Sequence, residues 1–260
     1  MSEQQHAYLK AMGIDVWVER TPVHLPAEDV TAEKVHKAQP ESSVENESAP
    51  TATESVTQPV TTAESYNEIE SLSWNELHSV VANCHNCDLA DNRTKIIFGE
   101  GSQHASLMIL GGAPNEEDEQ QGHPFSGEAG SLLSAMIKAM GYQRSEVYIT
   151  NLVKCTTLNN QDPSPAEVVA CEGYLTRQIK LVQPDVILVL GSVTAQRFLK
   201  SKSTMSRLRG QLHFIDSIAI PVIVTYEPGY LLRSPNEKRK AWEDLQLAMK
   251  ELSTKSNSTQ

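Results

Sequence analysis

The chain has 260 residues, a formal net charge of −11, 39% hydrophobic residues and 5% aromatic residues. This length is enough for one substantial domain or two small ones. No apolar run reaches the roughly 18 residues that a membrane helix needs, and the N-terminus lacks a signal-peptide pattern, so we expect a cytoplasmic protein without membrane contact.

A short apolar element opens the chain, and residues 1–22 are too few to build a core of their own. Residues 21–72 then contain ten acidic side chains and two lysines, a net charge of −8. Because this stretch is also poor in apolar anchors, we predict a disordered, extended linker over residues 23–72. An acidic chain disfavours nucleic-acid binding, since phosphate contacts need Lys or Arg, but here most of the acidity lies in that one segment.

The remaining sequence predicts one α/β domain over residues 73–252 and a flexible tail over 253–260. Ser73, with Glu76 three residues later, forms a capping-box pattern that predicts a helix over 74–84. Apolar strands are predicted at 106–111, 146–151, 185–191 and 219–226, and further helices at 127–141, 165–183, 192–200 and 236–252. This alternation indicates a mostly parallel sheet with helices on both faces.

Small and polar residues follow each predicted strand: GGAPN, NLVKC, GS and YEPGY. In open parallel sheets, ligands bind beyond the carboxyl ends of the strands. We therefore expect the four loops to converge on one pocket, although the same residues are also common in ordinary turns.

Four cysteines form a second pattern, with Cys84 and Cys87 in a CxxC pair and Cys155 and Cys171 farther along. Cysteines of a cytoplasmic protein stay reduced, which favours metal ligands over disulfides. Four thiolates suit either tetrahedral zinc or a cubane iron–sulfur cluster, and the spacing does not choose between them. The alternative is that Cys155 and Cys171 are small buried residues.

Several segments together resemble the iron–sulfur, family 4, uracil-DNA glycosylases over Ser73 to about Met249. They are NCHNCDLADNRTKIIFGEG, GGAPNEEDEQQGHPFSGEAGSLL, EVYITNLVKC, SPAEVVACEGYL, VILVLG, SRLRG and PGYLLR. The resemblance implies a three-layer αβα fold and a structural [4Fe–4S] cluster on all four cysteines, with zinc as the alternative. It also implies a role in DNA repair or replication near the nucleoid, with single-stranded or uracil-containing DNA as partner.

The resemblance also assigns a base-binding pocket. Phe125 matches the aromatic residue that stacks on an extruded base, and Asn151 matches the amide that pairs with the uracil edge. The first post-strand loop supplies Gly111, Gly112 and Ala113. A core Phe and a turn Asn are the alternative interpretations of the first two residues.

Two reacting positions of the family differ in this chain. Gly112 stands where the family reads Glu, and Glu227 stands where it reads His. Cleavage leaves an anion on uracil, and loss of one donor to that charge costs on the order of 10²–10³ in rate. An ionised Glu has no proton to donate. Glu227 and Asn151 therefore remain as uncertain catalytic candidates, and Glu116, Glu117 or Glu119 are possible replacements for the missing Glu.

Three arginines are candidate DNA contacts. Arg207 and Arg209 lie in the SRLRG segment, which matches a basic segment of the family near the DNA strand, and Arg233 adds positive charge nearby. A solvated helix face is the alternative interpretation.

The N-terminal residues YLKAMGIDVWVERTP resemble the first residues of the psi subunit of the bacterial DNA polymerase III clamp loader. That resemblance implies docking on the clamp-loader collar through Leu9, Met12, Ile14 and Trp17, and a folded part that binds the chi subunit. Two hypotheses follow: a catalytically impaired replisome module, or an active iron–sulfur glycosylase that excises uracil or another damaged base.

Overall fold

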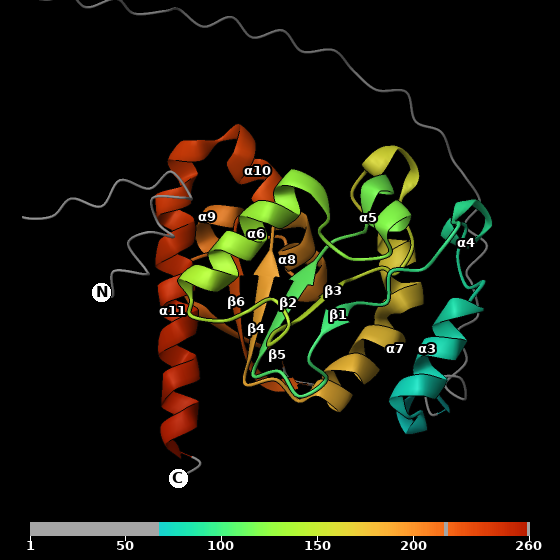
Figure 1. Ribbon diagram of the computed structural model, residues 1–260, viewed down its shortest axis with the longest axis horizontal. Helices are drawn as coiled ribbons and strands as arrows, with labels where there is room; N and C mark the ends of the chain where they lie inside the picture. Colours follow the sequence, from blue (N-terminus) through green and yellow to red (C-terminus); the bar gives the residue numbers. More distant parts are fainter. Residues whose placement is uncertain (1–67, 216–217, 259–260) are drawn as a thin grey trace, which may run out of the picture. The chain divides into compact units, whose positions relative to one another are not determined.

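A six-stranded sheet with the order β1-β3-β2-β4-β6-β5 lies at the centre of the computed structural model, which describes residues 68–215 and 218–258 (Figure 1). Four central strands run parallel: β2 (Leu107–Gly111), β3 (Tyr148–Asn151), β4 (Val186–Leu190) and β6 (Ile218–Thr225). The edge strands β1 (Glu100–Gly101) and β5 (Leu212–Ile215) are antiparallel to their neighbours. The mostly parallel sheet is confirmed, whereas the two short edge strands were not predicted.

Helices cover both faces of the sheet, which gives three layers (Figure 1). One face packs against α6 (Gly127–Ala139), α10 (Pro228–Arg233) and α11 (Lys238–Ser258). The other packs against α7 (Pro165–Val182), α8 (Ser192–Phe198) and α9 (Met205–Leu208). Every residue of β4 is buried, as its unbroken apolar run predicts for a strand covered on both sides.

A smaller helical layer lies outside α7. Helix α3 (Trp74–Ala82) begins where the sequence predicts, and the Glu76 carboxylate accepts hydrogen bonds from the Ser73 backbone N–H at 2.8 Å and hydroxyl at 2.6 Å. Its apolar side packs on α7 in a separate small core. Helix α4 (Leu89–Asn92) follows the CxxC pair.

Residues 68–71, which the sequence analysis assigns to the linker, are helical. Ile69 and Leu72 pack against the core between α3 and α7, and the Arg177 guanidinium donates to the Leu72 carbonyl at 2.7 Å. This packing was not predicted from the sequence, because the acidic composition of the segment indicated a linker in spite of these two apolar residues. Residues 23–67 of the predicted linker lie outside the described residues.

Helix α11 continues to Ser258, six residues into the segment that the sequence analysis assigns to a flexible tail. The Ser253 and Thr254 hydroxyls donate to the Lys250 carbonyl at 2.7 and 3.0 Å. Helix propagation adds one hydrogen bond for each residue fixed, so an established helix extends through weak helix formers. None of the helices in the described ranges has the length and hydropathy that a membrane span requires.

Candidate functional site

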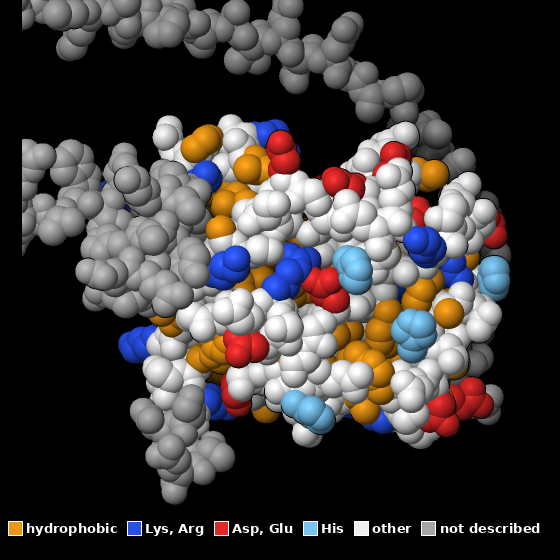
Figure 2. Space-filling model, in the orientation of Figure 1, with side chains coloured by type: hydrophobic (Ala, Val, Ile, Leu, Met, Phe, Trp, Pro, Cys, Tyr) orange, Lys and Arg blue, Asp and Glu red, His pale blue; other side chains and the backbone are white. Residues whose placement is uncertain are grey.

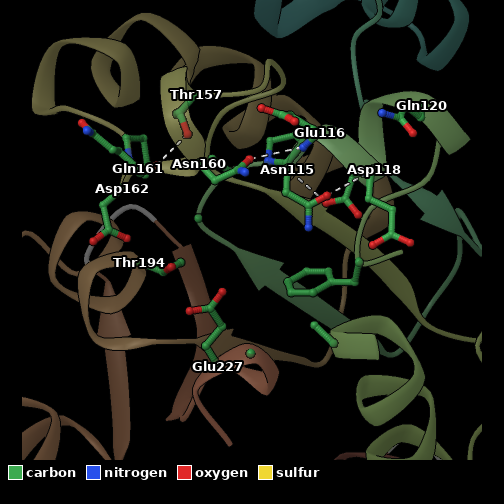
Figure 3. Close-up of a pocket in the computed structure, with 18 of the residues that line it drawn as sticks. Asn115, Glu116, Asp118, Gln120, Thr157, Asn160, Gln161, Asp162, Thr194 and Glu227 are labelled. Carbon is green, nitrogen blue, oxygen red and sulfur yellow. Dashed lines mark hydrogen bonds between the residues drawn. The ribbon is translucent and has the colours of Figure 1, made fainter. Parts of the chain in front are cut away.

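A pocket of about 670 Å³ lies beyond the carboxyl ends of the four parallel strands (Figure 3). The loop after β2 and helix α5 (Glu116–Gln121) form one wall, while Thr194 of α8 and Glu227 after β6 form the facing wall. The loop after β3, with the short helix η1 (Leu158–Asn160), completes the rim. The predicted convergence of four loops is therefore confirmed. The lining residues are Gly112, Ala113, Pro114, Asn115, Glu116, Glu117, Asp118, Gln120, Phe125, Ala129, Thr157, Asn160, Gln161, Asp162, Pro163, Thr194, Glu227, Gly229 and Arg233.

Gly111 and Asn151 lie directly behind the Phe125 ring, so of the predicted pocket residues these two do not line the cavity itself. They are opposite partners on β2 and β3. A Cβ on Gly111 would collide with both the Asn151 side-chain oxygen and the Phe125 ring. Glycine is therefore required here, because it lets the amide and the aromatic ring lie side by side.

The Asn151 side chain is 1% exposed, and neither its Oδ1 nor its Nδ2 has a hydrogen-bond partner in the described structure. A buried amide without partners costs free energy of about 1–3 kcal/mol. Such a group beside a pocket is expected where a ligand supplies the missing donor and acceptor.

Phe125 has a left-handed backbone with φ of 54°, which is uncommon for a non-glycine residue. Arg144 holds this turn in place, since its guanidinium donates to the carbonyl groups of Pro124 and Phe125 and pairs with Glu100. Helix α6 also approaches so closely that a Cβ on Gly130 would collide with the Phe125 carbonyl. Strained backbone of this kind persists where the surroundings fix it, often at ligand sites.

The acidic loop is organised by one buried carboxylate. Asp118 is 3% exposed and accepts hydrogen bonds from the backbone N–H groups of Ser126 at 2.6 Å and Asn115 at 3.1 Å. Asn115 caps α5 in return, accepting from the Asp118 N–H at 2.8 Å. Burial raises the pKa of Asp118, which these donors partly offset. Asp118 thus fixes the loop that carries Phe125.

Gly112 and Glu227, the two positions that the sequence analysis expects to differ from the family, line the same cavity. A Cβ on Gly112 would lie 3.1 Å from the Thr194 hydroxyl and 3.8 Å from Pro163, so a side chain there would point into the pocket beside α8. Glu227 lies at the N-terminus of α10, and Figure 3 shows it on the same wall as Thr194. Helix α10 was not predicted, because Pro228 and Gly229 indicate a turn.

Glu227 is exposed to solvent, but the surrounding pocket walls partly shield its carboxylate from water. This desolvation raises its pKa, the nearby Asp162 raises it further, and Arg233 opposes the shift. The fold therefore favours a proton on Glu227, a state that the sequence analysis leaves open.

The predicted replacements for the missing Glu separate into two groups. Glu116 and Glu117 line the pocket. Glu119 instead accepts hydrogen bonds from the backbone N–H groups of Thr94 and Lys95, so it anchors the chain that leads to β1.

Sequence reasoning missed the rim residues Thr157, Asn160 and Asp162, and also Thr194. Asn160 has a φ of 53°, and its side-chain oxygen accepts from the Glu116 N–H at 3.3 Å, which joins the rim to the acidic loop. The consecutive asparagines of LNNQDP were a signal for such left-handed turn residues.

The three predicted DNA-contacting arginines have different surroundings. Arg209 is a structural residue: its side chain is 15% exposed, bonds the fully buried Asp244 at 3.1 Å and lies 6.0 Å from the Tyr226 ring centroid. Arg207 is exposed on α9, and Arg233 is exposed at the pocket. On the face shown in Figure 2, positive and negative side chains are interspersed.

The four cysteines are free, and Cys87, Cys155 and Cys171 pack in one small core where the loop between α3 and α4, the loop after β3 and α7 meet. Cys84 packs in the neighbouring core between α3 and α7 and interacts electrostatically with Cys87 and Cys155. Cys155 and Cys171 are buried, and the thiols are close enough to influence one another electrostatically. Burial raises the pKa of Cys87 and Cys155, and that of Cys171 to about 12. Within the described ranges, no three His, Cys, Asp or Glu side chains are arranged to hold a single metal ion.

Two cations lie against these thiols. The Arg93 guanidinium is 3.1 Å from the Cys155 sulfur. Lys154 is 1% exposed, and its ammonium donates to the Thr150 hydroxyl and the Asn151 carbonyl, each at 2.7 Å. Burial lowers its pKa to about 7, and Cys171 and Cys155 oppose that shift. Four thiols can bind a metal ion or cluster as negative thiolates. The two adjacent basic side chains fit such a group, because they would offset its negative charge.

The predicted partner-binding residues Leu9, Met12, Ile14 and Trp17 lie outside the described residues.

Comparison with known proteins agrees with this geometry. Residues 98–246 match the family described as the Uracil DNA glycosylase superfamily. The type-4 uracil-DNA glycosylase of Thermotoga maritima is 39% identical over 172 residues, which cover 65% of this chain and 88% of that protein. The enzyme of the same name from Archaeoglobus fulgidus is 34% identical over 178 residues, or 66% of this chain and 89% of the relative. The chain thus belongs to the uracil-DNA glycosylase superfamily.

Proposed function

We propose that this protein takes one extruded base of a DNA strand into the pocket and hydrolyses its N-glycosidic bond. The observation that carries this proposal is the buried Asn151 amide, which lacks hydrogen-bond partners and lies beside the strained Phe125. The Phe125 ring offers a stacking surface, and the amide behind it offers one donor and one acceptor to a base edge once the ring moves aside. The match to glycosylases over most of their length supports the same role.

Uracil is the first base to test, because the relatives are named uracil-DNA glycosylases. A protonated Glu227 can donate a hydrogen bond to departing uracil, whereas the ionised form repels its charge. Uracil excision is therefore expected to be slow at neutral pH and faster in mild acid.

The experiment measures binding and single-turnover cleavage of a single-stranded oligonucleotide that contains one uracil, with the thymine version as reference. Asn151→Ala and Phe125→Ala should each weaken uracil-dependent binding at least about fivefold. Val169→Ala, at an exposed site on α7, serves as the matched control. If Asn151→Ala and Phe125→Ala both bind and cleave like wild type and the control, the pocket has no role in base recognition.

We further propose that Cys84, Cys87, Cys155 and Cys171 hold a [4Fe–4S] cluster, with zinc as the alternative. The packing of Cys87, Cys155 and Cys171 in one core, the electrostatic contact of Cys84 with two of them, and the basic side chains of Arg93 and Lys154 support this assignment. A bound cluster would supply a structural cross-link between two loops and α7. Anaerobically purified protein should be brown and contain iron and sulfide, and Cys171→Ala should lose both. A colourless protein with one zinc would instead establish the alternative.

A second candidate function is a replisome module that resembles the psi subunit and lacks efficient chemistry. The observation that favours it is the presence of Gly112 and Glu227 where the family reads Glu and His. This candidate predicts that clamp-loader subunits, including chi, capture the full-length protein, and that removal of residues 1–20 abolishes capture by the collar. Robust uracil cleavage by the wild type would contradict it.

A further inference from the structure

The charged residues that line the pocket are mainly acidic. Its acidic residues are Glu116, Glu117, Asp118, Asp162 and Glu227, whereas Arg233 is the one Lys or Arg among the lining residues of the described chain. The Asp118 carboxylate is already used by two backbone N–H groups of its own loop. The remaining four acids lie on both walls, with Glu227 and Asp162 opposite Glu116 (Figure 3).

This charge matters because departing bases differ in charge. Uracil in DNA is neutral and leaves as an anion, so its departure needs a hydrogen-bond donor or positive charge. A purine alkylated on a ring nitrogen is already a cation, and it leaves as a neutral molecule. Carboxylates hinder the first reaction, but they attract the second base and also stabilise the positive charge that develops on the sugar.

On the basis of the glycosylase-type function proposed above, we propose that the pocket's preferred base is a cationic, ring-N-alkylated purine. In the reaction, the bond between C1′ and the base nitrogen breaks, and its electron pair goes to the base and cancels the positive charge. Water adds to C1′ and gives up one proton to a pocket carboxylate or to solvent. The products are the neutral alkylated base and an abasic sugar with a hydroxyl group at C1′.

Two features independent of the acidic cluster fit such a ligand. Asn151, 1% exposed and without partners for its amide, lies next to the cavity behind Phe125 and offers both a donor and an acceptor to a purine edge that displaces the ring. Phe125 lines the cavity, and its ring face attracts a cation more strongly than a neutral base. The volume of about 670 Å³ is also within the range of pockets that enclose small ligands.

Glu227 is the residue that distinguishes this preference from that of a uracil enzyme. It occupies the position where the family reads His, and its Oε1 lies 3.9 Å from where a Cβ on Gly229 would stand, at the start of α10. Replacement of this carboxylate should therefore change the ratio between base classes and not only the overall rate.

The test uses the full-length protein and three oligonucleotides of one sequence, containing 7-methylguanine, uracil or unmodified guanine. Single-turnover cleavage and equilibrium binding are measured for each. Wild type should release 7-methylguanine at least 100-fold faster than uracil at neutral pH. Glu227→Gln should reduce that ratio about tenfold or more, and Glu227→His should invert it. Glu128→Gln, an exposed acid on α6 that does not line the pocket, is the matched control.

Faster release of uracil than of 7-methylguanine by wild type would overturn the preference, and so would an unchanged ratio in Glu227→Gln. In both cases the broader function stands as long as Asn151→Ala abolishes base-dependent binding or cleavage. If wild type neither binds nor cleaves any of the modified oligonucleotides better than the guanine control, both proposals fail.

Discussion

The two halves of the pocket differ in what they carry. The half built on β2 and β3 carries Phe125 and Asn151, the two residues proposed to bind the base, and each is backed by a basic side chain that bonds main-chain carbonyl groups, Arg144 for the first and Lys154 for the second. The half built on β4 and β6 carries Glu227, whereas Gly112, the other position expected to differ from the family, directly follows β2 and lies next to Thr194 of α8. The two residues proposed to recognise the base therefore lie together in one half, and the two differing positions are divided between the halves.

The scaffold of the half built on β4 and β6 depends on Arg209. Arg209→Met leaves Asp244 buried without its partner, which should lower the free energy of unfolding by roughly 3–5 kcal/mol. Urea denaturation measures this effect, with the exposed Arg207→Met as control. Unchanged stability together with weaker DNA binding would show that Arg209 contacts DNA and does not stabilise the fold.

The half built on β2 and β3 should separate function from stability. Asn151→Ala removes the pairing amide, worth about 1–3 kcal/mol of base recognition, or roughly 5- to 150-fold in affinity. The same change should leave thermal stability unaltered or improved, because the buried amide has no partner to lose. A clear loss of stability with intact base binding would show that the amide serves the fold.

Lys154 tests whether the cysteine site supports the half built on β2 and β3. Lys154→Met removes the bond to the Asn151 carbonyl and the positive charge beside Cys155 and Cys171. We expect lower metal content and about tenfold weaker Asn151-dependent binding. Lys138→Met, on the exposed end of α6, is the control. Full metal content and full affinity in Lys154→Met would show that the two sites are independent.

The pH dependence sharpens the contrast between base classes. Because enclosure and Asp162 raise the Glu227 pKa against the effect of Arg233, this carboxylate gains its proton at a higher pH than an ordinary Glu. As pH falls through that value, uracil release should accelerate up to about tenfold, while release of a cationic base should slow. Rate profiles of both substrates check the opposite signs, and Glu227→Gln should flatten both.

The smallest expected effect is on strand contacts outside the pocket. Arg207 is exposed on α9, so Arg207→Ala should weaken binding to single-stranded DNA only a few-fold, for every base. The slope of log affinity against log salt should fall by roughly 0.7. A salt titration measures it, and an unchanged slope would place the strand elsewhere.

Local patterns predicted much of this molecule. The unbroken apolar run predicted strand β4, and the capping box at Ser73 predicted the start of helix α3, because each signal depends only on neighbours in the chain. The short edge strands β1 and β5 escaped prediction, since two to four residues become strands only when a neighbour offers hydrogen bonds. The helical ends at 68–71 and 253–258 were missed for a similar reason, as composition conceals packing and helix propagation.

By itself, the sequence determined the mostly parallel α/β class and the part of the chain that forms the pocket, because strand periodicity and turn residues are local properties of the chain. Only the tertiary structure decided that Arg209 pairs with Asp244, that Asn151 is buried without partners, and that Asp162 faces Glu227. Burial, pairing and electric field depend on residues that are distant in the chain and become neighbours when the sheet and its helices pack together.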